Sequence, residues 1–142
     1  VYFFVGPSGC GKTQTAKEIA KLYFGSYDNY IKIDMSEYSE PSSVTKLIGS
    51  PPGYVGHDNQ TYIVDSIRKN PHSVIILDEI EKANKEVVNI FLNVFDEGYF
   101  FDARKRKIDF SNALIILTSN LGYSEETFIQ KKNRFYKYQR RA

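Results

Sequence analysis

The sequence predicts an α/β domain built on a mainly parallel sheet with helices on both faces. Its short apolar runs are continuous rather than alternating, which is typical of strands covered on both sides. The segments between these runs show helical spacing of apolar residues, and a glycine-rich turn follows the first run. Alternating strands and helices favour right-handed crossovers and therefore a three-layer sandwich.

The composition fits one globular domain. The chain has 142 residues, of which 42% are hydrophobic and 15% aromatic, too many for a disordered segment. Its apolar runs fall short of the ~18 residues of a membrane span, so we expect none. A single cysteine excludes an internal disulfide, and two histidines give no metal-ligand cluster. The net charge of +2 gives no general reason to expect nucleic-acid binding.

The four apolar runs are predicted to be buried strands. They are Val1–Val5, Tyr30–Ile33, Val74–Leu77 and Ala113–Leu117. Since the chain opens inside such a run and without Met, we expect it to be an excerpt of a longer protein. We expect a core over residues 1–122 and a basic helix or tail over 123–142. The tail's alternative interpretation is a nucleic-acid patch, because aromatic side chains are interleaved with its basic ones.

Helices are predicted where apolar residues recur at i, i+3, i+4 and i+7. The first follows Thr13 and ends at Gly25, with inward residues Ala16, Ile19, Ala20 and Tyr23. A second ends at Gly98, with inward residues Val87, Ile90, Phe91, Val94 and Phe95. Weaker patterns predict helices over Thr61–Arg68, over Pro41–Leu47 with Ser39 as N-cap, and from Ser124 through Phe128 and Ile129.

A phosphate-binding loop is predicted between the first strand and the first helix. The pattern G-x-x-x-x-G-K-[ST] is formed by Gly6, Pro7, Ser8, Gly9, Cys10, Gly11, Lys12 and Thr13. Glycines let backbone N–H groups point at phosphates, and the helix dipole reinforces them. We expect Lys12 to bridge the β- and γ-phosphates and the Thr13 hydroxyl to bind Mg²⁺. Cys10 is interpreted as a small residue at a tolerant position, or alternatively as an oxidisable thiol at a helix N-terminus.

Two further strand ends carry polar side chains. Asp78 and Glu79 follow the third strand, where a carboxylate suits Mg²⁺ and a second one polarises an attacking water. Asn120 follows the fourth strand and is expected to bind the γ-phosphate or that water. Because parallel strands bring their carboxyl ends to one edge, these groups should lie together. The alternative interpretations are an ordinary acidic turn and an asparagine that starts a turn.

These residues and the segments between them resemble the second ATPase domain of ClpB/ClpC-type AAA+ chaperones. The similar stretches are GPSGCGKT, IDMSEY (33–38), LIGSPPGYVG (47–56), ILDEIEKA (76–83) and LTSNLG (117–122). The resemblance implies a P-loop NTPase fold of the AAA+ type and an ATPase that uses ATP and Mg²⁺. It also implies a homo-hexamer that threads unfolded polypeptides through a central pore.

The resemblance assigns roles to individual residues. Lys12 and Thr13 match the Walker A loop, Asp78 and Glu79 match Walker B, and Asn120 matches sensor 1. Tyr54 and Val55 match the aromatic pore loop; glycines flanking such a loop leave its aromatic side chain free to grip a passing chain. The alternative for Tyr54 is an ordinary turn with a surface tyrosine.

The sequence also departs from the family's pattern. Only Asp102 and Arg106 remain of the usual segment after Gly98, so subunit contacts are expected to differ. We find no arginine finger and no small helical C-terminal domain in these residues. A second hypothesis is therefore a non-catalytic nucleotide-binding or assembly module, and a DNA-remodelling ATPase is disfavoured. A ClpP-type protease partner is unresolved, and the compartment is expected to be the cytoplasm or an organelle.

Overall fold

The computed structural model describes residues 1–53 and 61–121. Along the chain the elements are β1 (Tyr2–Val5), α1 (Lys12–Phe24), β2 (Tyr30–Asp34), the one-turn 3₁₀ helix η1 (Met35–Tyr38), α2 (Ser43–Ile48), α3 (Tyr62–Lys69), β3 (Val74–Asp78), a second 3₁₀ turn η2 (Ile80–Lys82), α4 (Lys85–Glu97), β4 (Tyr99–Phe101), β5 (Lys107–Asp109) and β6 (Leu114–Ser119). The predicted helix from Ser124 and the tail 123–142 lie outside the described residues. So do Tyr54 and Val55.

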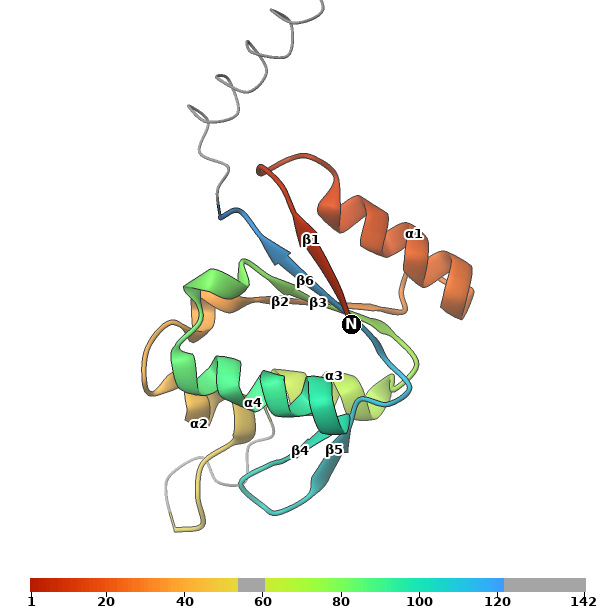
Figure 1. Cartoon of the computed structure of the whole chain (residues 1–142). Helices are drawn as coiled ribbons and strands as arrows, with labels where there is room; N and C mark the ends of the chain where they lie inside the picture. Colours follow the sequence, from red (N-terminus) through yellow and green to blue (C-terminus); the bar gives the residue numbers. More distant parts are fainter. Residues whose placement is uncertain (54–60, 122–142) are drawn as a thin grey trace, which may run out of the picture.

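Four parallel strands form the central sheet in the order β1-β6-β3-β2. Figure 1 shows α1 on one side of this sheet and α2, α3 and α4 on the other. All four predicted strands and the helices over 61–68 and 87–95 are therefore confirmed, as is the three-layer arrangement. Because all strands run in parallel, their carboxyl ends share one edge, and the polar strand ends lie there.

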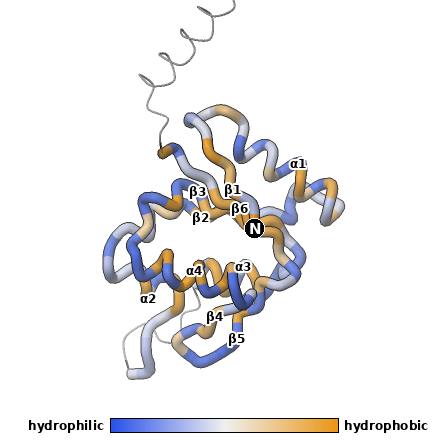
Figure 2. Tube along the Cα trace, viewed as in Figure 1, coloured by the Kyte–Doolittle hydropathy of each residue, from blue (hydrophilic) through white to orange (hydrophobic). Residues whose placement is uncertain are grey.

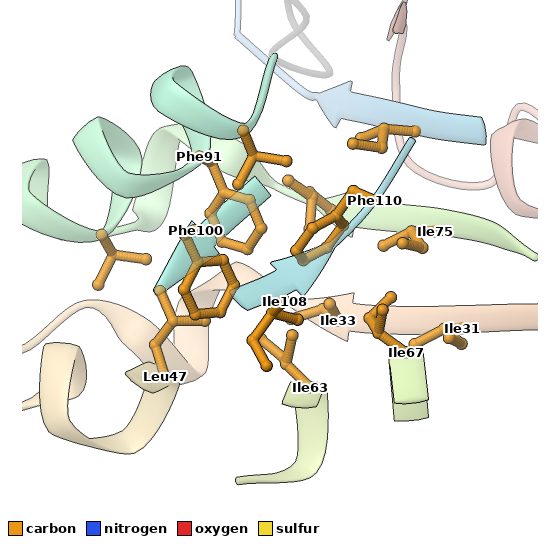
Figure 3. Packing of buried hydrophobic residues seen from close by; sticks show 14 of the residues in the cluster. Ile31, Ile33, Leu47, Ile63, Ile67, Ile75, Phe91, Phe100, Ile108 and Phe110 are labelled. Atoms are coloured by element: carbon orange, nitrogen blue, oxygen red, sulfur yellow. The ribbon is translucent and has the colours of Figure 1, made fainter. Parts of the chain in front are cut away.

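The sheet separates two hydrophobic cores. On the side of α1, the small residues Ala16 and Ala20 pack on the strand residues Val74, Ile76 and Ile116. The opposite side buries a larger core that includes Ile33, Leu47, Ile63, Phe91, Phe100 and Phe110, and Figure 3 shows these side chains packed against one another. Figure 2 shows hydrophobic residues along the strands. Burial on both faces explains why β3 reads as a continuous apolar run.

The prediction that the first apolar run is buried was wrong. Val1, Tyr2, Phe3 and Val5 are all exposed, because β1 is an edge strand that pairs only with β6 among the described residues. Tyr23 on α1 is exposed as well, although its spacing predicted an inward position. The inner face of α1 is made by two alanines, and this close packing leaves Tyr23 at the margin of the helix contact.

The helix predicted over Pro41–Leu47 is shorter than expected. It begins at Ser43, with Ser42 in the cap position and no side-chain cap hydrogen bond. Ser39 instead ends η1, so its predicted capping role was wrong. Asp34 starts η1 by accepting hydrogen bonds from the backbone N–H and the hydroxyl of Ser36. These bonds hold the pKa of the Asp34 carboxyl below its usual value.

A β-hairpin that the sequence did not predict follows α4. Strands β4 and β5 pair antiparallel, and Phe100 and Ile108 from the hairpin enter the larger core. The two residues that survive from the family's pattern, Asp102 and Arg106, form an ion pair that closes the hairpin turn, with Nη2 2.7 Å from Oδ2. Among the described residues none of the helices combines the length and apolarity that a membrane crossing requires.

Candidate nucleotide site

A cavity of about 340 Å³ lies at the carboxyl edge of the sheet. It is lined by Ser8, Gly9, Gly11, Lys12, Thr13, Gln14, Lys32, Asp78, Glu79 and Asn120. The structure therefore brings the predicted glycine-rich loop, the acidic pair and Asn120 around one space. Gly6, Pro7 and Cys10 belong to the same loop, and the Cys10 side chain is exposed.

The glycine-rich loop presents backbone donors to this cavity. Gly9 and Gly11 have φ angles of 76° and 94°, a left-handed conformation that other residues rarely adopt. Gly11 occupies the N-cap position of α1 without a side-chain cap, so the first-turn N–H groups of the helix are available to an anion. At its start the loop is tied to the sheet, because the Gly6 N–H donates to the Ser119 carbonyl at 3.2 Å.

Lys12 uses its ammonium to hold the loop and the sheet edge together. Its Nζ donates to the carbonyl oxygens of Gly6 at 2.7 Å and Pro7 at 3.0 Å, and to Asn120 Oδ1 at 2.9 Å. The Cys10 Sγ lies 4.0 Å from the same Nζ as a fourth, weaker partner. These contacts place the Lys12 ammonium at the mouth of the loop, between the carboxyl ends of β1 and β6.

Asp78 is held from two sides at the end of β3. Lys32 Nζ lies 2.6 Å from Asp78 Oδ2, and the buried Thr118 hydroxyl donates to Oδ1. Burial raises the pKa of the Asp78 carboxyl, but the hydrogen bonds from Lys32 and Thr118 outweigh it and leave the pKa below its usual value. The carboxylate is thus charged at neutral pH and faces the cavity beside Thr13.

Glu79 adopts a strained backbone conformation immediately after β3. Its φ of 57° and ψ of 52° are left-handed, and its N–H donates to Thr118 Oγ1 at 3.1 Å. The conformation costs on the order of 1–2 kcal/mol for a residue with a Cβ. The turn directs the side chain so that Lys82 Nζ lies 2.5 Å from Oε2. Strained residues of this kind are enriched at functional sites, although Lys105 in the hairpin turn has a similar φ of 59°.

Asn120 joins the two halves of the site. Its Oδ1 accepts from Lys12, and its Nδ2 donates to Glu79 Oε1 at 2.7 Å. Because an ammonium only donates and a carboxylate only accepts, both contacts fix the same orientation of the amide. The backbone N–H of Asn120 in turn donates to Glu81 Oε1 at 3.0 Å. A single amide thus connects the glycine-rich loop to the acidic strand end.

Four residues of this network were missed from the sequence: Lys32, Thr118, Glu81 and Lys82. A charged residue inside a predicted buried strand was the available signal for Lys32. Thr118 and Glu81 lie inside the similar stretches LTSNLG and ILDEIEKA, but nothing in the residue types pointed to their contacts. Only the pairing of β3 with β6 brings Thr118 to Asp78 and Glu79.

Known proteins are similar to this chain in sequence. Residues 1–141 match the family described as AAA domain (Cdc48 subfamily). Chaperone protein ClpB of Chlamydia caviae is 51% identical over 125 residues, which is 88% of this chain and 14% of the relative. ClpB of Staphylococcus epidermidis RP62A is 50% identical over 121 residues, 85% of this chain and 14% of the relative. The chain thus spans about 14% of the length of these curated relatives.

A solved structure gives the same result. The closed-state cryo-EM reconstruction of Hsp104 with ATPγS and FITC casein is 40% identical, with a TM-score of 0.77 over 85% of this chain and 21% of that one. The predicted fold class, an AAA+ P-loop NTPase with a mainly parallel sheet, is confirmed by this likeness. With the family match over nearly its whole length, the chain belongs to the AAA domain family of the Cdc48 subfamily.

Proposed function

We propose that this domain binds ATP with Mg²⁺ and hydrolyses it. The observation that carries the proposal is the link through Asn120, which connects Lys12 in the glycine-rich loop to Glu79 after β3 around one cavity. Backbone N–H groups of the loop bind the phosphates, and Lys12 neutralises their charge. Glu79 orients and deprotonates the attacking water, and Asn120 fixes the position of the Glu79 carboxylate.

The residues present fit a magnesium ion. Asp78 and Thr13 line the same cavity and offer a carboxylate and a hydroxyl, the hard oxygen ligands that Mg²⁺ prefers. When bound, the ion neutralises negative charge on the phosphates. Asp78 is kept ionised for this role by its two hydrogen-bond donors. Cys10 belongs to the phosphate-binding loop in this proposal, and its backbone N–H donates to the Pro7 carbonyl at 3.4 Å within that loop.

We infer further that the domain works within a ring-forming ClpB-type unfoldase. The relatives are named chaperones, and the Hsp104 structure contains ATPγS and casein, a nucleotide analogue and a polypeptide. In this proposal the protein is a homo-hexamer that threads unfolded polypeptides, with Tyr54 and Val55 as the pore loop.

A cytoplasmic location is part of the proposal, since both relatives come from bacteria. They give no support to an organelle or to a ClpP-type protease partner.

Replacing Lys12 by methionine tests nucleotide binding. Losing a charge-assisted contact to phosphate is expected to weaken the affinity for fluorescent mant-ADP by about 10- to 100-fold. Fluorescence titration measures the affinity, and thermal unfolding checks that the variant is folded. The control Lys46→Met removes an exposed ammonium away from the cavity, which pairs with Glu37 at 3.4 Å on the surface. Equal affinities of all three proteins would remove the glycine-rich loop from its role.

Replacing Tyr54 by alanine tests the pore-loop proposal. An aromatic side chain that packs on a passing polypeptide contributes about 1 kcal/mol or more, so unfolding of a tagged substrate should slow about tenfold. ATP hydrolysis should persist, and Tyr54→Phe should retain most of the unfolding rate. The measurement is loss of fluorescence from a folded reporter substrate in the native assembly. Unchanged unfolding by the alanine variant would reject the assignment.

A further inference from the structure

Lys32 is the one cationic side chain lining the cavity, among the described residues, that the nucleotide-binding motifs do not account for. It lies in the middle of β2, and its side chain is 40% exposed toward the cavity that Lys12, Thr13 and Asp78 also line. A solvent-exposed lysine on a strand edge ordinarily extends into water. This one lies with its ammonium 2.6 Å from the Asp78 carboxylate.

Strand register explains how Lys32 reaches this position. In the parallel pair of β2 and β3, Lys32 lies opposite Ile76 and Asp34 lies opposite Asp78. Ile76 packs on the side of the sheet that faces α1, so Lys32 projects toward the same side as the glycine-rich loop. Its long side chain then reaches diagonally to Asp78, two residues further along the neighbouring strand.

The contact occupies the carboxylate to which magnesium coordination is assigned. Thr118 donates to Oδ1 of Asp78 and Lys32 to Oδ2, so each oxygen already has one donor. A divalent cation that approaches Oδ2, directly or through a water ligand, meets the positive charge of Lys32 at contact distance. Two cations at one carboxylate repel each other, so each weakens the binding of the other.

We propose that Lys32 is a built-in competitor of the divalent cation at Asp78 and sets the metal dependence of nucleotide binding. Without a divalent ion, its ammonium supplies positive charge beside Asp78, so metal-free nucleotide is tolerated. With the ion, the repulsion between the ion and the Lys32 ammonium lowers the gain from metal binding. This inference rests on the proposed nucleotide site and extends it to the ligand class, a divalent-cation complex of a nucleoside phosphate.

The test compares mant-ADP affinity in EDTA with that in saturating Mg²⁺. The dissociation constant in EDTA divided by that in saturating Mg²⁺ measures the coupling between metal and nucleotide. A general loss of folding or of phosphate affinity cancels from this ratio. We expect Lys32→Met to raise this ratio about tenfold over the unsubstituted protein, because an ammonium no longer repels the metal. Lys32→Arg keeps the charge and should keep the ratio within about threefold.

Three controls make the outcome decisive. Lys32→Gln also removes the charge and must reproduce the rise, whereas Lys46→Met removes an exposed charge elsewhere and must not. The rise must persist at raised ionic strength, since salt screens distant charges but not a contact pair. An unchanged or lowered ratio in Lys32→Met, with mant-ADP still bound, overturns this inference alone. Absence of mant-ADP binding to the unsubstituted protein overturns the proposed function and this inference with it.

Discussion

Replacing Glu79 by glutamine is expected to lower ATP hydrolysis at least about 100-fold and to leave nucleotide affinity within about threefold. Glutamine has the same shape, and its amide oxygen can still accept the hydrogen bond from Asn120 Nδ2. It cannot take a proton from water, so the proposed chemical step loses its base. The ion pair with Lys82, at 2.5 Å, is lost as well.

The geometry gives a reason to expect an effect this large. Glu79 is held in a left-handed conformation by its N–H bond to Thr118 and by the side-chain bond from Asn120. A base fixed in this way needs little rearrangement before it acts on a bound water. Among the described residues, Glu79 is the only carboxylate that follows Asp78 directly and accepts a hydrogen bond from the side-chain amide of Asn120. A neighbouring acid is therefore not expected to substitute for it.

Steady-state release of phosphate by the native assembly, together with mant-ATP titration, measures both quantities. The control is Glu97→Gln, an exposed glutamate in the last turn of α4 that is far from the cavity in the fold. It should leave hydrolysis unchanged. Normal turnover in Glu79→Gln would remove Glu79 from the catalytic role, and loss of nucleotide affinity would make it a structural residue instead.

Replacing Asp102 by alanine is expected to cost about 3 kcal/mol of the free energy of unfolding. The Asp102 side chain is only 2% exposed, and its carboxylate accepts from the backbone N–H groups of Arg104 and Arg106 and from the Arg106 guanidinium. Removing it leaves two backbone donors and a partly buried cation without this partner. The hairpin would loosen, and Phe100 and Ile108 would lose their fixed place in the core.

This contribution depends on pH in a defined direction. Burial raises the pKa of Asp102, but the Arg106 side chain and the backbone donors outweigh it, so the folded-state pKa lies below its usual value. A lowered pKa stabilises the fold above the unfolded-state value of about 3.9, and this stability is lost as the pH falls through the folded-state value. The difference between the unsubstituted protein and Asp102→Ala should therefore shrink below about pH 4.

Urea unfolding followed by circular dichroism at several pH values measures this effect. Asp102→Asn keeps an acceptor for the two backbone donors and should lose about half as much stability. Asp109→Ala, on the exposed side of the same hairpin, should lose no more than about 1 kcal/mol, because its bond to the Ser111 N–H is open to water. A loss at Asp102 no larger than that at Asp109 would contradict a structural role for the ion pair.

The Asp102–Arg106 pair also changes the meaning of a sequence observation. Both residues stood out as survivors of a family pattern, and the sequence suggested altered contacts between subunits. In the structure they bind each other within one hairpin. The hairpin itself was not predicted, since its strands have only three residues each. Its position next to α4, seen in Figure 1, is set by packing. Short strands give too little periodicity to be recognised.

Periodicity and composition were sufficient to predict the elements in which burial follows a regular pattern along the chain. β3 and β6 are covered on both faces and read as apolar runs, while α4 buries one face and shows its spacing along Val87, Phe91 and Val94. The same reasoning failed at β1, whose apolar residues are exposed. A run of apolar side chains states how much hydrophobic surface a strand carries, and only the order of strands decides whether that surface is covered.

The sequence by itself predicted a phosphate-binding loop and an acidic strand end, because a glycine-rich loop and a strand-end carboxylate are local arrangements of neighbouring residues. Tertiary structure alone decided that Asn120 bridges Lys12 to Glu79 and that Lys32 lies on Asp78. These contacts join strands far apart in the chain, and their partners depend on strand order and register. Strand order and register cannot be recognised from the spacing of residues in the sequence, since both result from how the whole sheet packs.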